Sequence, residues 1–534
     1  MRNKILVVIG LVVLIFLFSC GNKPKDLQNI PNSTDFVFTV NLQQLMDKSG
    51  VDNFSETKMY DLVFDGDSSN SLSELKKFDY IFKDKEQSGV NFNTQLFVYG
   101  MSNKSGWQTS MAVNFGLLDA DKFETLLNKS ISSDEDSISI NENANIKYLI
   151  SSKEGNRSII AWDNKLAVIY SINKGYCTNE LLIERTKSII ELSMSNSIAN
   201  NKSFVEFYEN KKDVSVWFNS SFALNRLPKD YNAMVNMQLP FNPQGIEYRY
   251  YISFEKGYIQ SESELILPDE LHGFLDRYKI IKPDFDNDIL KYIPGNSMVN
   301  FSVAINAHEL YRMIKGLYKE RQMNVDGIES MLNGSMDMEV EKLLEAINGE
   351  VVFNIHDIGV VDNISELDPN TLKPTKSTKF KASLLIKLDN KELYTWFLKQ
   401  FNDNEAEMIN GYYILNESGD ALYASMVDSI MMITNDMKVI EGFVAKQKQN
   451  PSLKDTEVAK YLNNYSLFAM LNLDYSTYSS DVQDYYSRNY LKHDKAKIYS
   501  KLKEIRFQPV DSYHSKVIME LNDNTKNSLE VLFN

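Results

Sequence analysis

The strongest constraint on the fold is that the chain repeats itself. Ile30-Pro31, followed by the strand-like residues 36–40, recurs as Ile293-Pro294 followed by residues 299–303, which is an offset of 263 between positions 30 and 293. Blocks that recur in one order at so long a period indicate copies of a domain, not a solenoid of short repeats. We therefore expect two homologous domains in tandem.

Later blocks in each half support the same alignment. The matched positions keep their order along the chain: Ala112, Leu118, Asp119 and Phe123 correspond to Ala382, Leu388, Asp389 and Leu393, and Tyr148, Gly155 and Asp163 correspond to Tyr412, Gly419 and Asp428. The offset grows to 270 (112 to 382) before it shrinks again. We attribute the increase to a longer polar loop at residues 359–379 of the second copy.

Each copy is predicted to have the α+β fold class. Apolar and polar residues alternate in runs such as 36–42, 111–117, 158–162, 214–218 and 249–254, which is typical of half-buried strands. Short polar connections such as residues 163–165 favour antiparallel hairpins. We expect a mainly antiparallel β-sheet with helices packed on one face in each domain, the first covering residues 30–280 and the second residues 281–534.

Capping residues mark where helices should begin. Asp119 precedes an apolar-periodic segment that reaches Lys129, and either Thr178 or Asn179 precedes one that reaches Leu192. Pro268 opens another helix. The alternating acids at positions 284, 286 and 288 resemble part of a calcium loop, but apolar residues follow at once, so we interpret them as caps of a helix that runs into Tyr292.

The N-terminal segment predicts export and lipid anchoring. Arg2 and Lys4 precede an apolar run at residues 5–18, which is too short to span a bilayer and fits a cleaved signal peptide at residues 1–19. The run ends in Leu17-Phe18-Ser19-Cys20-Gly21, the spacing of a bacterial lipobox. We expect lipidation of Cys20 and a tether at residues 20–29. The tether lacks an acidic cluster, which favours the outer membrane facing the periplasm over the cell surface.

Composition narrows the possible partners. The net charge of −15 argues against nucleic acid, because no net positive field is available to release counterions from phosphates. Cys177 is the only cysteine besides Cys20, so the mature chain can form no internal disulfide. We interpret Cys177 as an inert thiol and expect the fold to depend on its apolar core.

The opening of the mature chain resembles a known family. Residues 30–42, together with Leu45 and Lys48-Ser49-Gly50, are similar to the start of the uncharacterised Bacteroidetes lipoproteins grouped as domain of unknown function 4836. The resemblance covers the lipobox and the layout of most of the mature chain. It implies an envelope lipoprotein and carries over no catalytic residue, because these motifs are structural.

No motif for catalysis or metal binding stands out. The five histidines are scattered at positions 272, 308, 356, 493 and 514, with no pair at zinc-ligand spacing. Nucleophile-elbow, P-loop and dinucleotide fingerprints are missing. We therefore predict no metal, no cofactor and no enzymatic activity. The alternative of a hydrolase with an unrecognised active site would require two carboxyl groups facing each other in a cleft, one with a raised pKa.

Tyrosines provide the one hint of a binding surface. They are crowded in a polar stretch after residue 473, where exposed rings could stack on sugars or anchor an interface: Tyr475, Tyr478, Tyr485, Tyr486 and Tyr490. The alternative is that these rings merely cover the sheet. The sequence favours a non-enzymatic envelope lipoprotein that binds or scaffolds an envelope protein or glycan, with a glycan-binding surface lipoprotein of a nutrient uptake system as the first alternative.

Overall fold

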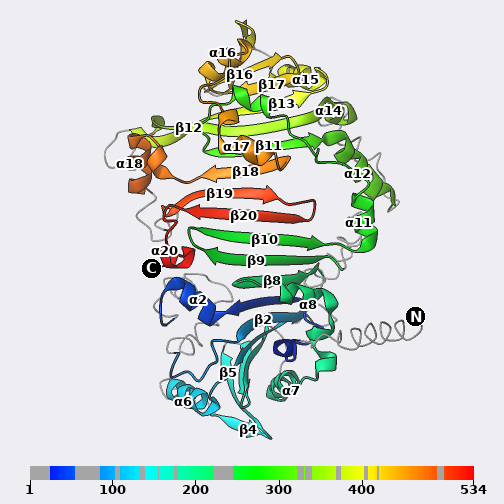
Figure 1. Cartoon of the computed structure of the whole chain (residues 1–534), viewed down its shortest axis with the longest axis vertical. Helices are drawn as coiled ribbons and strands as arrows, with labels where there is room; N and C mark the ends of the chain where they lie inside the picture. The colour runs from blue at the N-terminus through cyan, green and yellow to red at the C-terminus, as the bar shows by residue number, and fades with distance from the viewer. Residues whose placement is uncertain are drawn as a thin grey trace, which may run out of the picture. The chain divides into compact units, whose positions relative to one another are not determined.

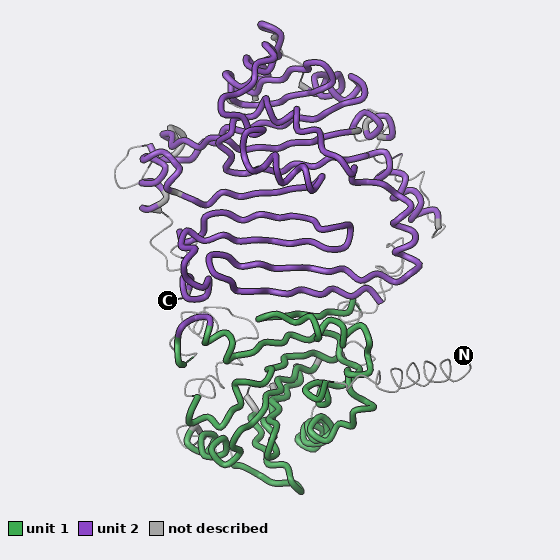
Figure 2. The backbone as a smooth tube through the Cα atoms, viewed as in Figure 1, with its two compact units in different colours: residues 1–47, 51–229 green, residues 48–50, 230–534 purple. Residues whose placement is uncertain are grey.

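A computed structural model describes most of the chain after the N-terminal segment. The described residues are 24–53, 85–102, 109–131, 139–153, 156–173, 178–220, 245–320, 330, 340–367, 374–401, 407–417, 420–489, 498 and 500–533. Cys20, Cys177 and Tyr490 lie outside these residues. The chain forms two compact units, residues 1–47 with 51–229 and residues 48–50 with 230–534 (Figure 2).

Unit 1 is built on one antiparallel sheet. Hydrogen-bonded neighbours follow the order β8 (Val214–Asn219), β1 (Phe36–Asn41), β2 (Gln95–Ser102), β3 (Thr109–Gly116), β7 (Leu166–Asn173), β6 (Asn156–Trp162), β5 (Ile146–Lys153) and β4 (Asn141–Asn143). Its helical segments are η1 (Lys25–Leu27), α2 (Leu42–Ser49), α6 (Ala120–Ile131), α7 (Asn179–Ile190), η3 (Met194–Asn196), η4 (Ile198–Asn200) and α8 (Lys202–Glu209).

The capping residues predicted for unit 1 are confirmed. The Lys122 N–H donates to Asp119 Oδ1 at 2.9 Å at the start of α6, and the Leu181 N–H donates to Thr178 Oγ1 at 3.3 Å at the start of α7. Helix α6 then places Phe123 against Trp162 of β6, with the rings edge to face and their centroids 5.6 Å apart. Both side chains are buried, so this contact belongs to the core of the unit.

Unit 2 contains a longer antiparallel sheet. Its neighbours follow the order β9 (Glu247–Glu255), β10 (Tyr258–Ile266), β20 (His514–Leu521), β19 (Leu502–Pro509), β18 (Leu467–Asn472), β11 (Val299–Asn306), β12 (Ile347–Leu367), β13 (Pro374–Leu388), β17 (Ile430–Thr434), β16 (Asp420–Val427), β15 (Tyr412–Glu417) and β14 (Glu407–Ile409) (Figure 1).

The helical segments of unit 2 include short 3-10 turns as well as α-helices. They are α11 (Asp269–Leu275), η5 (Asn287–Tyr292), α12 (Ala307–Glu320), α14 (Val340–Ala346), α15 (Glu392–Phe401), α16 (Met437–Val444), η6 (Leu453–Asp455), α17 (Glu457–Leu462), η7 (Tyr475–Thr477), α18 (Ser480–Asn489) and α20 (Ser528–Phe533). Among the described residues, no helix has the length and apolarity needed to cross a membrane.

Strand pairing follows the same plan twice along the chain. The path β8–β1–β2–β3–β7–β6–β5–β4 in unit 1 corresponds strand for strand to β18–β11–β12–β13–β17–β16–β15–β14 in unit 2. One helix, α6 or α15, follows β3 or β13 in each path.

The compact units divide at residue 229, ahead of the boundary near residue 280 that the sequence repeat predicts. The reason is strand pairing: β9 pairs with β10, and β10 pairs with β20 at the far end of the chain, with Tyr258 opposite Glu520 and Glu264 opposite His514. These two strands therefore belong to the same compact unit as the second half of the chain.

The polar loop predicted at residues 359–379 is wrong. Strands β12 and β13 continue through most of this segment as a long hairpin, with Gly359 opposite Lys379 and Asn363 opposite Thr375. The end of this hairpin contains several Thr, Ser and Lys residues, a composition that is typical of loops. Backbone hydrogen bonding between strands does not require an apolar face.

Helices cover both faces of unit 2 at β13, whereas the sequence predicts helices on one face. Leu385 packs in a cluster with Ile440 and Phe443 of α16, and Ile386, the next residue, packs with Leu393 of α15. Successive side chains of a strand point to opposite faces, so these two contacts identify helices on both sides. The predicted caps are confirmed here too: Asp286 accepts from the Asp288 N–H at 3.0 Å as η5 begins.

Asp436 stabilises the start of α16. Its carboxylate accepts the Lys438 N–H at 3.0 Å and contacts His356 Nε2 at 3.4 Å, and His356 is only 3% exposed. The hydrogen bond with His356 and the charge of Lys381 outweigh burial and hold the pKa of Asp436 at about 2. The stability that this group contributes is therefore present above about pH 4, its unfolded pKa, and is lost as pH falls towards 2.

We expect Asp436→Ala to lower the free energy of unfolding by about 2 kcal/mol or more at neutral pH, because it removes a helix cap and leaves a buried imidazole without its partner. Urea unfolding followed by circular dichroism measures this loss. Asp436→Asn is the matched control, since it keeps the capping oxygen and should lose less. Equal stability of all three proteins would contradict this role for Asp436.

Candidate functional site

Two rows of apolar side chains cross five neighbouring strands of unit 2. The strand register sets Phe353, Phe301, Ala469, Phe507 and Val517 in one row, and Ile355, Val299, Leu471, Ile505 and Met519 in the next. Residues two apart on a strand share a face, so all ten lie on the same side of β12, β11, β18, β19 and β20. We call these ten residues the apolar sheet face.

The apolar sheet face is only partly covered by the rest of the chain. Phe301, Phe353 and Leu471 are 41%, 37% and 38% exposed, and the other seven residues are half-buried. Figure 1 shows β19 and β20, beside β10 and β9, with no labelled helix drawn across their centre. Contiguous exposed apolar surface in a folded protein marks an interaction site.

The opposite side of the same strands is buried and carries both apolar and polar side chains. Val352 and Phe468 are 0% exposed in the hydrophobic core. Asn300, Asn354 and Arg506 are 1%, 0% and 9% exposed. Asn354 Nδ2 donates to Ser297 Oγ at 2.6 Å, and Asn300 Oδ1 accepts from Ser302 Oγ at 3.0 Å. A half-covered antiparallel sheet normally turns its apolar side inward. Here both sides of the sheet carry apolar side chains, so the apolar sheet face is additional to the core of the unit.

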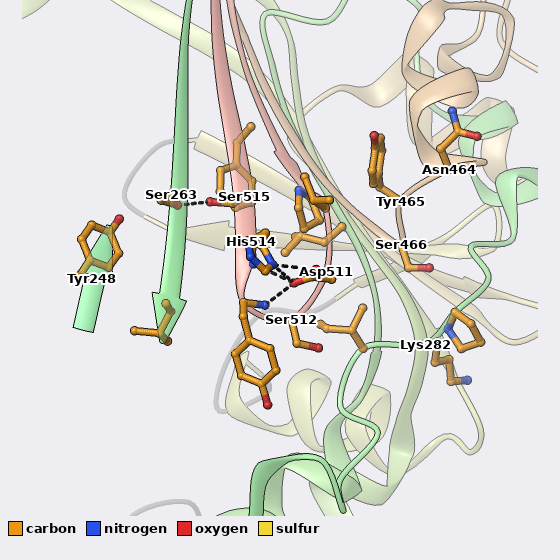
Figure 3. A pocket seen from close by; sticks show the side chains of 18 residues that line it. Tyr248, Ser263, Lys282, Asn464, Tyr465, Ser466, Asp511, Ser512, His514 and Ser515 are labelled. Carbon is orange, nitrogen blue, oxygen red and sulfur yellow. Dashed lines mark hydrogen bonds and ion pairs between the residues drawn. The ribbon is translucent and has the colours of Figure 1, made fainter. Parts of the chain in front are cut away.

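A pocket adjoins the apolar sheet face at one end of the strands. Its volume is about 610 Å³, and its walls come from the ends of β10, β19 and β20 and from residues 281–283 and 464–467 (Figure 3). Phe507 lines the pocket and belongs also to the apolar sheet face. The exposed side chains of Tyr248, Ile281 and Val510 lie at its edge, so the apolar surface continues from the sheet into the pocket.

His514 is the main titratable group of the pocket. Its Nδ1 lies 2.8 Å from both carboxylate oxygens of Asp511, and its Nε2 lies 3.3 Å from Glu264 Oε1. Glu264 in turn pairs with the buried Arg249 at 3.0 Å. Burial opposes a charge on the imidazole, but the two carboxylates prevail and raise the pKa of His514 above its usual value.

The carboxylates of Asp511 and Glu264 hold the imidazole of His514 between them, so His514 is not a free general base. Both ring nitrogens of His514 face carboxylates, so neither is available to accept a proton from a nucleophile. Tyr513 donates its hydroxyl to Asp276 at 2.9 Å, and burial followed by that carboxylate raises the pKa of Tyr513 to about 12. The tyrosine is therefore a neutral hydrogen-bond donor near neutral pH.

One pair of carboxyl groups faces each other with a raised pKa on one member, which is part of what a hydrolase with an unrecognised active site would require. Glu504 lies opposite Glu520 across β19 and β20, and burial, together with the charge of Glu520, raises the pKa of Glu504. Arg506 contacts both carboxylates, with its Nε 2.9 Å from Glu504 Oε1. Neither glutamate lines the pocket, so the pair is best understood as a charge cluster neutralised by Arg506.

Four of the five tyrosines predicted as a binding surface lie in described segments. Tyr475 lies in η7, and Tyr485 and Tyr486 lie in α18. Tyr478 is half-buried and donates its hydroxyl to the Asn472 carbonyl at 2.7 Å, which folds it onto its own chain. The binding role of these tyrosines stays a prediction.

Sequence reasoning missed both the apolar sheet face and the pocket. The alternation of β11 is plain in the sequence, but the usual interpretation turns Val299 and Phe301 inward and Asn300 outward. The pocket joins residues from β9 with residues of the final hairpin, which are far apart in sequence. No local pattern reports either arrangement.

Comparisons with known proteins place this α+β, antiparallel-sheet protein in a family. A model of the domain of unknown function DUF4836 matches residues 28–529. The chain therefore belongs to this family, as its opening residues predict. No curated protein matches it.

Solved structures give only remote similarity. Crystal form IV of TP0453 is 11% identical, with a TM-score of 0.24 over 47% of this chain and 85% of that chain. Crystal form III is 9% identical, with a TM-score of 0.24 over 48% and 87%. Scores this low carry no argument about architecture or function.

We expect His514 to stabilise the protein in a pH-dependent way. A raised folded pKa means that the contribution is complete below the unfolded pKa of about 6.5 and is lost as pH rises through the folded value. Because the side chain is partly exposed, His514→Asn should lower Tm by only about 1–2 °C near pH 5.5, and by less near pH 9. Differential scanning calorimetry measures the two shifts.

The Asp511→Asn background provides the control for this prediction. Removing one of the two carboxylates should shrink the pH-dependent part of the His514→Asn effect. A Tm difference that grows with pH would contradict the assignment.

Proposed function

We propose that this protein is a non-enzymatic cell-envelope lipoprotein that binds another envelope protein through the apolar sheet face of unit 2. The observation that carries the proposal is the apolar sheet face itself: ten apolar side chains lie on the less covered side of five strands, although the other side already packs Val352 and Phe468 in the core. An exposed apolar surface of this kind is stabilised when a partner covers it.

The size of the surface favours a protein as the occupant. Neighbouring strands are about 4.8 Å apart, so five strands span roughly 19 Å. This width exceeds that of one acyl chain or one sugar ring and suits the apolar centre of a protein interface. The net charge of −15 favours a partner that carries basic residues around its contact surface. It argues against an anionic lipid layer as the partner.

The lipobox supports an anchored location. Lipidation at Cys20 would hold the folded units at a membrane through a short tether. The absence of an acidic cluster after Cys20 favours the periplasmic side of the outer membrane, with the cell surface as the alternative.

The repeated strand plan supports an origin by duplication. The corresponding paths in the two units share their strand order and the helix after the third strand of the repeat. Together with the sequence repeat, this pattern supports two homologous copies, of which the second carries the apolar sheet face described above.

The pocket supports a second candidate, a glycan ligand. Tyr248, Tyr465 and Tyr513 line it beside Asn464 and Asp511, and aromatic rings with polar neighbours suit sugar binding. Isothermal titration calorimetry with envelope glycans would test this alternative. Loss of glycan binding in Tyr248→Ala and Tyr465→Ala, with binding retained in variants of Phe301 and Phe353, would favour it.

The apolar sheet face can be tested by placing charge on it. We expect Phe301→Lys with Phe353→Lys to lower the fluorescence of bound 1-anilinonaphthalene-8-sulfonate at least twofold, because the dye binds exposed apolar surface. In crosslinked cells the same variant should capture the specific partner at least tenfold less than the wild type, as quantitative mass spectrometry would record.

Met408→Lys is the matched control for this experiment. Met408 is 61% exposed in β14, away from the five strands of the apolar sheet face, so its replacement should leave dye binding and capture unchanged. The proposal would be contradicted if Met408→Lys lost both dye binding and partner capture. It would also be contradicted if the Phe301→Lys, Phe353→Lys variant kept both, with an unchanged Tm.

Anchoring is tested separately at Cys20. We expect Cys20→Ala to move the protein from the membrane fraction to the soluble fraction, because the acyl chains supply the attachment. Mass spectrometry of the mature N-terminus should show a diacylglyceryl cysteine in the wild type. An unmodified N-terminus that starts elsewhere would end the lipoprotein assignment.

A further inference from the structure

We propose that His308, Glu341 and Glu345 bind a divalent transition-metal ion between α12 and α14. His308 lies in the first turn of α12, and the two glutamates lie on α14, one helical turn apart. Side chains at positions i and i+4 of a helix share a face. A nitrogen of His308 and one carboxylate oxygen from each glutamate all lie within 4.8 Å of one another.

The imidazole of His308 has an unsatisfied nitrogen. Its Nδ1 is shielded from solvent and has no hydrogen-bond partner among the described residues. The closest carboxylate atom given for it, Glu345 Oε1, lies 3.7 Å away, which is too far for a hydrogen bond. Two ligands of a tetrahedral zinc ion, each about 2.1 Å from the metal, lie roughly 3.4 Å apart. The observed separation therefore fits a shared metal better than a direct bond.

The charges of the cluster also call for a cation. Glu341 and Glu345 are both exposed carboxylates on one helix face, and within the described part of the chain neither forms an ion pair with Lys or Arg. Two like charges at this spacing destabilise a helix. A divalent cation would neutralise both carboxylates and would bind the unpartnered Nδ1 of His308 as a ligand.

The donor set indicates the class of metal. One imidazole nitrogen with two carboxylate oxygens suits a borderline ion such as Zn²⁺, whereas Ca²⁺ and Mg²⁺ prefer oxygen ligands alone and Cu(I) prefers sulfur. Three protein ligands leave one tetrahedral position open to water. The ion would fasten α14 to α12 just before the chain enters β12, the strand that carries Phe353.

The test uses the purified full chain in detergent, freed of metal with EDTA, and Zn²⁺ alone as the probe. Isothermal titration near pH 7.5 should show one site with a Kd in the micromolar range or tighter, and Zn²⁺ should raise the Tm. We expect His308→Ala, and separately Glu341→Gln with Glu345→Gln, to weaken binding at least tenfold. Each should also abolish the rise in Tm.

His272→Ala is the matched control. His272 pairs with Asp276 at 3.0 Å on a helix of the same unit, but it belongs to no cluster of three ligands among the described residues. Its removal should leave Zn²⁺ affinity unchanged. The proposal is overturned if the wild type binds no Zn²⁺, if the glutamate variant binds as tightly as the wild type, or if His272→Ala loses as much affinity as His308→Ala.

Discussion

The register of β11 against β12 and β18 is the constraint on which the character of unit 2 depends. With Phe301 opposite both Phe353 and Ala469, the apolar side chains of three strands fall on one side and Asn300 falls on the other. Because the side-chain period of a strand is two, a slip of one residue would exchange the two sides completely. The pairing therefore decides which surface the protein presents, more than the content of apolar residues does.

The buried side of the sheet makes that register specific. A slip of one residue in β12 or β18 would turn Val352 or Phe468 out of the core, which costs the free energy of burying an apolar side chain. Arg506 adds a second restraint, since it lies between Glu504 and Glu520 on neighbouring strands. The residues of the buried side thus hold the apolar sheet face in its less covered position.

Local patterns in the sequence predict the local structure well. The strands at residues 36–41 and 214–219 and the helices capped by Asp119 and Thr178 follow from alternation and capping chemistry, each of which involves neighbouring residues. The family could be recognised from residues 30–50 for the same reason. The division of the chain into compact units could not, because it depends on β10 pairing with β20.

The candidate sites escaped prediction because their parts meet only in three dimensions. His514 and Glu264 are cross-strand neighbours from distant segments, as are Phe301 and Phe353. His308 is separated from Glu341 and Glu345 by most of a helix and the segment after it. The prediction of a loop at residues 359–379 failed for a different physical reason, because Thr, Ser and Lys residues at the start of β13 have the composition of a loop although their backbone pairs with β12.

The pairing of β10 with β20 also sets the order of events during synthesis. A ribosome makes residues 258–264 long before residues 514–520, so the outer edge of β10 has no partner from its own sheet until translation is nearly complete. An unpaired strand edge is a template for aggregation. This edge of β10 therefore stays without its native partner until the C-terminal hairpin emerges.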